Sequence, residues 1–75
     1  MSSRPVKRSL TLRGHRTSVS LEEPFWKEFR RIAEAGDLAI NELAAQIDEG
    51  RDLETGLATA IRLHVLEALK REAGR

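Results

Sequence analysis

The sequence predicts a mostly α-helical domain with a short β ribbon at its N-terminal end, assembled as a homodimer. Apolar residues alternate with polar ones between Ser9 and Leu21, as in a half-buried strand, and three later segments show the spacing of amphipathic helices. The chain has 75 residues and no cysteine, so it can bury only a modest core and has no disulfides to reinforce it. A second copy of the chain is therefore the expected source of additional buried surface.

Charge is distributed unevenly, although the formal net charge is only +1. Residues 1–20 contain no Asp or Glu, whereas every acidic residue follows them. A basic end of this kind is either a solvated tail or a segment that binds a polyanion. The strand pattern favours the second interpretation. The basic residues concerned are Arg4, Lys7, Arg8, Arg13 and Arg16.

Residues 1–7 show no periodicity and are predicted to form a flexible basic arm, with the folded domain spanning residues 8–75. The alternation then changes phase, because Leu10 and Leu12 occupy even positions whereas Val19 and Leu21 occupy odd ones. One continuous strand would put the two pairs on opposite faces. A break between them is required.

Three interpretations of this break remain open. A two-residue loop at Gly14-His15 would make a hairpin with a type II′ turn, in which Arg13 lies opposite Arg16. Alternatively, Gly14 is a bulge in one long ribbon, or residues 16–21 pair alone while residues 8–13 are disordered. A lone strand leaves both edges unpaired, so the strand is predicted to take its partner from another copy of the chain.

The first helix is predicted to begin at Pro24 and to end at Gly36-Asp37, since proline suits a first helical turn and these last residues tolerate a left-handed backbone. Its apolar stripe consists of Phe25, Phe29, Ile32 and Ala33. Trp26 lies beside the stripe and is predicted to pack against the core rather than to stack on a base.

A second helix is predicted to stop near Gly50, with a stripe of Ile40, Leu43, Ala44 and Ile47. Asp52 is the predicted N-cap of a third helix at about residues 53–71. The apolar face of this third helix is broader than one chain is expected to cover, and it consists of Leu57, Ile61, Val65, Ala68 and Leu69, with Leu63 off the face. No internal repeat is evident.

The segment RTSVSLEEPFWKEFRRIA, followed by a turn and LAINELAAQI, resembles the ribbon-helix-helix family of Arc/MetJ-type DNA-binding proteins. The match runs from Arg16 to about Asp48, and the added C-terminal helix resembles a bacterial subgroup. In this family one strand from each subunit pairs antiparallel about the dyad, and the ribbon enters the major groove. The resemblance implies a homodimeric, sequence-specific transcriptional regulator that binds double-stranded DNA.

The resemblance also implies roles for individual residues. Base reading falls to Arg16, Ser18 and Ser20. Phosphate contacts fall to Asn41, near the start of the second helix, and to Arg4, Lys7, Arg8 and Arg13. The dimer core comprises Val19, Leu21, Phe25, Phe29, Ile40, Leu43, Ala44 and Ile47.

Two departures from the family pattern leave an alternative open. Ala39 replaces the serine or threonine that often caps the second helix, and a hairpin in each chain would give the dimer four strands. A four-stranded sheet is too wide for a groove of about 12 Å. The alternative is a dimeric protein-interaction module that does not bind DNA, with the third helix contacting a protein partner, or an antitoxin-like adaptor, which would bind both DNA and a partner.

Other classes of function are not expected. The sequence offers no nucleophile, base and orienting group in a recognisable set, so no enzyme is predicted. His15 and His64 are predicted to be solvent-exposed, and without cysteine neither a metal site nor a cofactor is expected. The chain lacks a long apolar run, so no membrane association is expected, and the predicted location is the cytoplasm, at the nucleoid.

Overall fold

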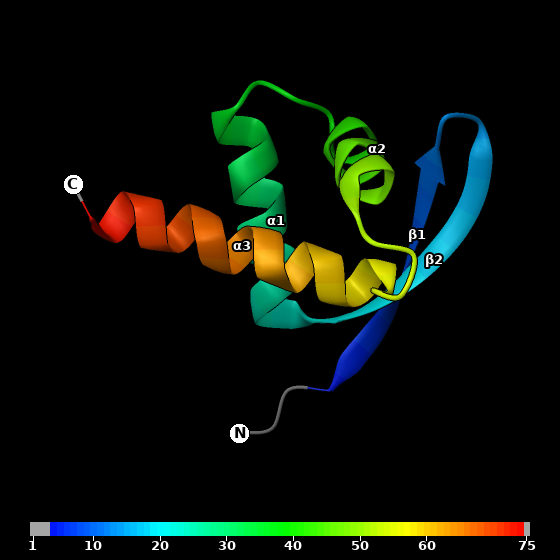
Figure 1. Ribbon diagram of the computed structural model, residues 1–75, viewed down its shortest axis with the longest axis horizontal. Helices are drawn as coiled ribbons and strands as arrows, with labels where there is room; N and C mark the ends of the chain where they lie inside the picture. The colour runs from blue at the N-terminus through cyan, green and yellow to red at the C-terminus, as the bar shows by residue number, and fades with distance from the viewer. Residues whose placement is uncertain (1–3, 75) are drawn as a thin grey trace.

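The computed structural model describes residues 4–74 as a β-hairpin followed by three helices (Figure 1). This confirms the predicted class of mostly helices with a short β ribbon. Residues 1–3 of the predicted arm lie outside the described residues, and its remainder is shorter than predicted because the first strand already begins at Pro5. The elements are β1 (Pro5–Leu12), β2 (His15–Glu22), α1 (Glu23–Ala35), α2 (Ile40–Gly50) and α3 (Leu57–Ala73).

The hairpin loop is Arg13-Gly14, so the predicted Gly14-His15 loop is wrong. Leu12 pairs with His15 across the loop, and Arg13 does not lie opposite Arg16. Arg13 and Gly14 have φ angles of 51° and 86°, as a type I′ turn requires at both central positions. This turn has the twist of the flanking strands, and a glycine at its second position takes positive φ without steric cost.

The polar and apolar faces of the hairpin nevertheless match the sequence prediction. The observed pairing shifts each partner by two residues relative to the predicted one, and a shift by two leaves every side chain on its face. Leu10, Leu12, Val19 and Leu21 are buried on the inner face. The structure thus contains neither a long ribbon with a bulge at Gly14 nor a disordered residue 8–13 segment.

The strand predicted to need a partner from another copy finds one within its own chain. β1 pairs antiparallel with β2 along the whole length of both strands, from the Pro5–Glu22 pair to the turn. One edge of β2 is therefore closed within a single molecule. The interpretation that a second copy must supply the paired strand is wrong.

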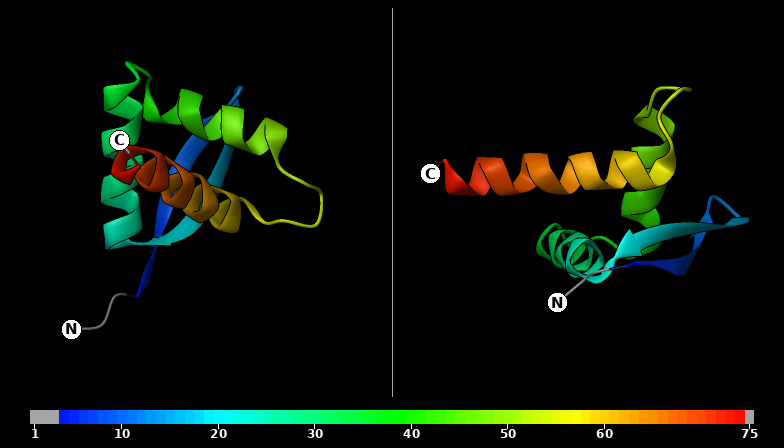
Figure 2. Two further views of the ribbon diagram at one scale, coloured as in Figure 1. Left: turned by 60° about the vertical axis from the view of Figure 1, so that its left-hand side comes forward. Right: turned by 90° about the horizontal axis from the view of Figure 1, so that it is seen from below.

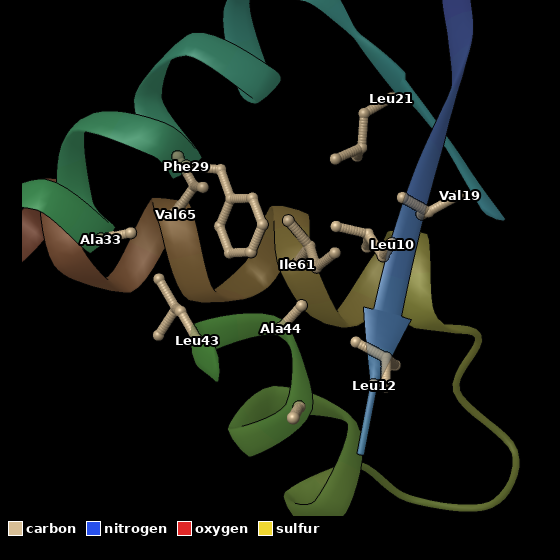
Figure 3. Close-up of a cluster of buried hydrophobic side chains, with 11 residues drawn as sticks. Leu10, Leu12, Val19, Leu21, Phe29, Ala33, Leu43, Ala44, Ile61 and Val65 are labelled. Carbon is tan, nitrogen blue, oxygen red and sulfur yellow. The ribbon is translucent and has the colours of Figure 1, made fainter. Parts of the chain in front are cut away.

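The core lies between the hairpin and α3, with α1 and α2 closing its sides (Figure 2). Phe29 from α1 and Ile61 from α3 are fully buried and point toward the hairpin leucines (Figure 3). Val65 adds a further buried side chain from α3, whereas Leu63 and Leu69 remain 53% and 38% exposed. The third helix thus covers the inner face of the hairpin with one side and leaves leucines uncovered on another.

The helix ends follow the predictions except at the start of α3. α1 has Glu23 and Pro24 in its first turn and ends at Gly36, and the residue with positive φ beyond it is Asp37. Asp52 does not cap α3. Its carbonyl oxygen instead accepts the Thr55 N–H at 3.0 Å in a turn, and α3 begins four residues later than predicted, after Gly56.

Candidate nucleic-acid interface

The outer face of the hairpin carries only polar and basic side chains along the middle of both strands. Residues of one strand alternate between the two faces, so the outward positions are the neighbours of the buried leucines and valine. All six are exposed: Lys7, Ser9 and Thr11 from β1, and Arg16, Ser18 and Ser20 from β2. Paired strands lie about 4.8 Å apart, so this two-stranded ribbon is narrow enough for a groove of about 12 Å.

The structure brings the three predicted base-reading residues, Arg16, Ser18 and Ser20, onto this one face. It also places Ser9 and Thr11 beside them, which the sequence analysis did not assign to the site. Ser9 lies directly opposite Ser18, and Thr11 lies opposite Arg16. The register decides which of these residues are directly opposed, whereas either candidate register puts Ser9 and Thr11 on this face.

Arg13, a predicted phosphate contact, is engaged by two carboxylates of α2. Its Nη1 donates to Oε1 of Glu42 at 2.7 Å, and its Nε donates to Oε2 of Glu49 at 2.8 Å. The hydrogen bond from Arg13 lowers the pKa of Glu42, and the hydrogen bonds to Glu49 and Glu42 raise the pKa of the Arg13 guanidinium. These contacts connect the hairpin turn to α2, and the two carboxylates neutralise the positive charge of Arg13.

Arg8, another predicted phosphate contact, lies on the inner face of the hairpin. Its guanidinium carbon lies 5.1 Å from the centroid of the Trp26 ring, and its Nη2 pairs with Glu23. The Arg8 side chain is only 20% exposed. Trp26 also packs beside Phe29, with ring centroids 6.0 Å apart, so the prediction that this tryptophan is a packing residue is confirmed.

Asn41 contacts the hairpin rather than an open helix end. Its Oδ1 accepts the backbone N–H of Thr11 at 3.1 Å and so satisfies part of the free edge of β1. At the opposite edge, Arg62 of α3 donates from Nη2 to the carbonyl oxygen of Ser20 at 3.4 Å and from Nε to Glu22 at 2.9 Å. Each free strand edge is thus partly covered at one end, β1 by α2 and β2 by α3.

Some of the basic residues near the hairpin are neutralised by carboxylates, so fewer free positive charges remain there than the sequence alone suggests. Within residues 4–74, Arg8 and Arg13 form ion pairs with helix carboxylates, whereas Arg4, Lys7 and Arg16 form none. These last three side chains are exposed. Arg4, Lys7 and Arg16 are thus the basic side chains near the hairpin that carry no ion pair within residues 4–74.

The residues predicted for a dimer core form the core of one chain. Five of them, Val19, Leu21, Phe29, Leu43 and Ala44, are buried there. The others, Phe25, Ile40 and Ile47, are partly buried and pack against the same cluster. Leu10 and Leu12 of β1 and Ile61 and Val65 of α3 complete the same cluster, so these residues are buried within one molecule.

The two histidines differ in environment. His15 flanks the hairpin loop and is exposed, as predicted. His64 is partly buried, which the prediction of a solvated side chain missed, and burial together with the charge of Arg71 lowers its pKa. His64 lines a groove of about 500 Å³ between α2 and α3, together with Leu43, Ile47, Leu63, Glu67 and Arg71.

Comparison with protein-family models shows to which family this chain belongs. Residues 5–69 match the model of the ribbon-helix-helix domain family. The chain is a ribbon-helix-helix protein. No curated protein and no solved structure matches it. The match includes the whole hairpin and most of α3, so both elements lie within the ribbon-helix-helix domain.

Ribbon-helix-helix domains usually bind DNA as regulators, typically form dimers and belong to a non-enzymatic fold family. In this ribbon-helix-helix chain, no helix of the described residues is long and apolar enough to cross a membrane. The match to the family model confirms the resemblance to ribbon-helix-helix proteins that was inferred from RTSVSLEEPFWKEFRRIA.

Proposed function

We propose that this protein is a sequence-specific, DNA-binding transcriptional regulator that inserts the outer face of its hairpin into the major groove. The observation that carries the proposal is the narrow, two-stranded ribbon whose exposed face presents Arg16, Ser18 and Ser20. An arginine can donate two hydrogen bonds to the O6 and N7 of guanine, and serine hydroxyls can contact any base. The proposal includes no catalytic step.

The surroundings of the hairpin support this orientation. In the right-hand view of Figure 2, α3 lies on the inner side of the hairpin, and no helix of residues 4–74 covers the outer face. Arg13 and Asn41 hold the hairpin to α2, and Arg62 holds its other end to α3. The ribbon is thus a supported projection, and a rigid support fixes where its side chains meet the bases.

Titration of duplex DNA from a random-sequence pool at two salt concentrations tests this function. About three cations per chain, Arg4, Lys7 and Arg16, give roughly six phosphate or base contacts for two copies. Affinity should then fall by about a thousandfold between 50 and 200 mM salt. The control is Lys27→Ala, which removes an exposed positive charge on α1 and should bind like the wild type. Absence of binding at both salt concentrations would contradict the proposal.

We propose further that the acting form is a homodimer in which each copy keeps its own hairpin. The family usually dimerises, and apolar side chains remain exposed on α3, where Leu63 and Leu66 are 53% and 49% exposed. Two copies would read two half-sites, as two-fold symmetric regulators do. Light scattering at micromolar concentration should give twice the mass of 8.4 kDa. Leu66→Lys should give that of one chain, and a monomeric wild type would contradict this part.

A second candidate is the protein-interaction module or antitoxin-like adaptor. The groove between α2 and α3 favours it, because Leu43, Ile47 and Leu63 give its walls an apolar part and the groove lies away from the hairpin. Such grooves accept an amphipathic helix of a partner protein. The DNA titration separates the regulator from the interaction module, since the module would bind no DNA even at low salt. An antitoxin-like adaptor would bind DNA and, in addition, a partner protein in this groove.

A further inference from the structure

We propose that β1 is an internal counterpart of β2, so that one chain presents a ribbon with local two-fold symmetry in which Lys7, Ser9 and Thr11 read bases as well. This inference rests on the proposed DNA binding. In the usual arrangement of the family, two chains each contribute one strand. Here a single chain contributes both strands, and the counterpart residues belong to β1.

The register reveals the symmetry. In an antiparallel pair, a local two-fold axis perpendicular to the sheet passes between two directly opposed residues. The axis between Ser9 and Ser18 relates residues 7–12, KRSLTL, to residues 16–21, RTSVSL, position by position. It exchanges Lys7 with Arg16, which are both basic, and Thr11 with Ser20, which both carry a hydroxyl group.

The side chains of the inner face are related by the same local two-fold axis. Leu10 and Val19 are exchanged by it and are 2% and 4% exposed, and Leu12 and Leu21 are exchanged and are 8% and 0% exposed. The two strands therefore bury equivalent side chains and expose equivalent side chains. The one dissimilar pair is Arg8 and Thr17, where Arg8 turns inward to Trp26.

This symmetry predicts how the ribbon reads DNA. It places one cationic donor at each end of a diagonal across the outer face, with hydroxyl groups between them. Lysine as well as arginine donates to the O6 and N7 of guanine. Because the local axis of the ribbon would coincide with a local dyad of the duplex, each hairpin should prefer a short, nearly palindromic element with one guanine on each strand.

The test compares Lys7→Ala with Arg16→Ala on the sequence that the wild type selects from a random pool. Both side chains are exposed and outside any described ion pair, so both variants should fold, which circular dichroism verifies. Each variant should bind the selected sequence about 5- to 150-fold more weakly and should lose its preference at one base pair. The two affected base pairs should be related by the local dyad. Lys27→Ala should change neither property.

Base preference separates the possible outcomes. If two β2 strands from two chains formed the reading ribbon, β1 would lie outside it, and Lys7→Ala would weaken all sequences equally while Arg16→Ala alone altered preference. That result would overturn the internal counterpart and leave the proposed function standing. Absence of DNA binding by the wild type would instead remove the proposed function and this inference with it.

Discussion

Leu21→Asp should leave the protein unfolded. Leu21 is 0% exposed on the inner face of β2, so the substitution removes a buried leucine and puts a carboxylate among the apolar side chains shown in Figure 3. Loss of leucine burial costs about 2 to 3 kcal/mol, and an unpaired buried charge costs several more. A domain of this size has a free energy of unfolding of roughly 4 to 11 kcal/mol. Far-UV circular dichroism should show loss of the helical signal.

The neighbouring residue supplies the control. Ser20→Asp introduces the same carboxylate one position earlier, on the exposed outer face, and should retain the fold because the charge stays in water. Urea titration of both variants gives their stabilities directly. A folded Leu21→Asp protein with the stability of Ser20→Asp would contradict the placement of β2 with Leu21 inward.

The helices could be predicted from the sequence because their signal is local. In α1, Phe25, Phe29 and Ile32 recur at helical spacing, and Pro24 and Gly36 mark the ends, so propensity and pattern agree. The start of α3 could not be predicted in the same way. Asp52 has the chemistry of an N-cap, but contacts within the loop, including that of Arg51 Nη1 to the Thr55 carbonyl oxygen at 2.8 Å, keep it outside the helix.

The loop of the hairpin could not be predicted because burial does not discriminate between the two candidate registers. A loop at Gly14-His15 and a loop at Arg13-Gly14 leave the same side chains inside. The observed loop requires a left-handed backbone at Arg13, which local preferences disfavour. Contacts of Arg13 with Glu42 and Glu49, distant in the sequence, accompany that conformation.

The faces on which the candidate site residues lie could be predicted in part, and the inward position of Arg8 was predictable but missed. The outward positions of β2 follow from alternation alone, whereas the β1 residues directly opposite them depend on the register. Arg8, however, has the same parity as Leu10 and Leu12, so alternation already indicated an inward side chain. The correspondence between KRSLTL and RTSVSL is not evident from the sequence because it consists of similar residue types, and the pairing of the strands is what relates them.

Ser18→Asp should weaken specific DNA binding roughly 150-fold while leaving the fold intact. Ser18 is exposed near the middle of the outer face, directly opposite Ser9, so a carboxylate there would project into the groove between two phosphate backbones. Juxtaposed like charges cost several kcal/mol, and a cost of about 3 kcal/mol weakens binding roughly 150-fold. Titration of the selected duplex measures the loss, and thermal melting should show wild-type stability.

Ser18→Asn separates charge from size in this experiment. Asparagine is similar in size to aspartate but neutral, and it can donate to and accept from base edges, so we expect a loss of less than about tenfold. The difference between the two variants should shrink as salt is raised, because screening weakens the repulsion between the introduced carboxylate and the phosphates. Equal affinities of Ser18→Asp and wild type at low salt would mean that the outer face of the hairpin does not meet DNA. A large loss of DNA affinity that is shared by both variants and does not depend on salt would instead indicate steric exclusion. The major groove would then have no room for a side chain larger than serine at this point, since steric exclusion does not respond to screening.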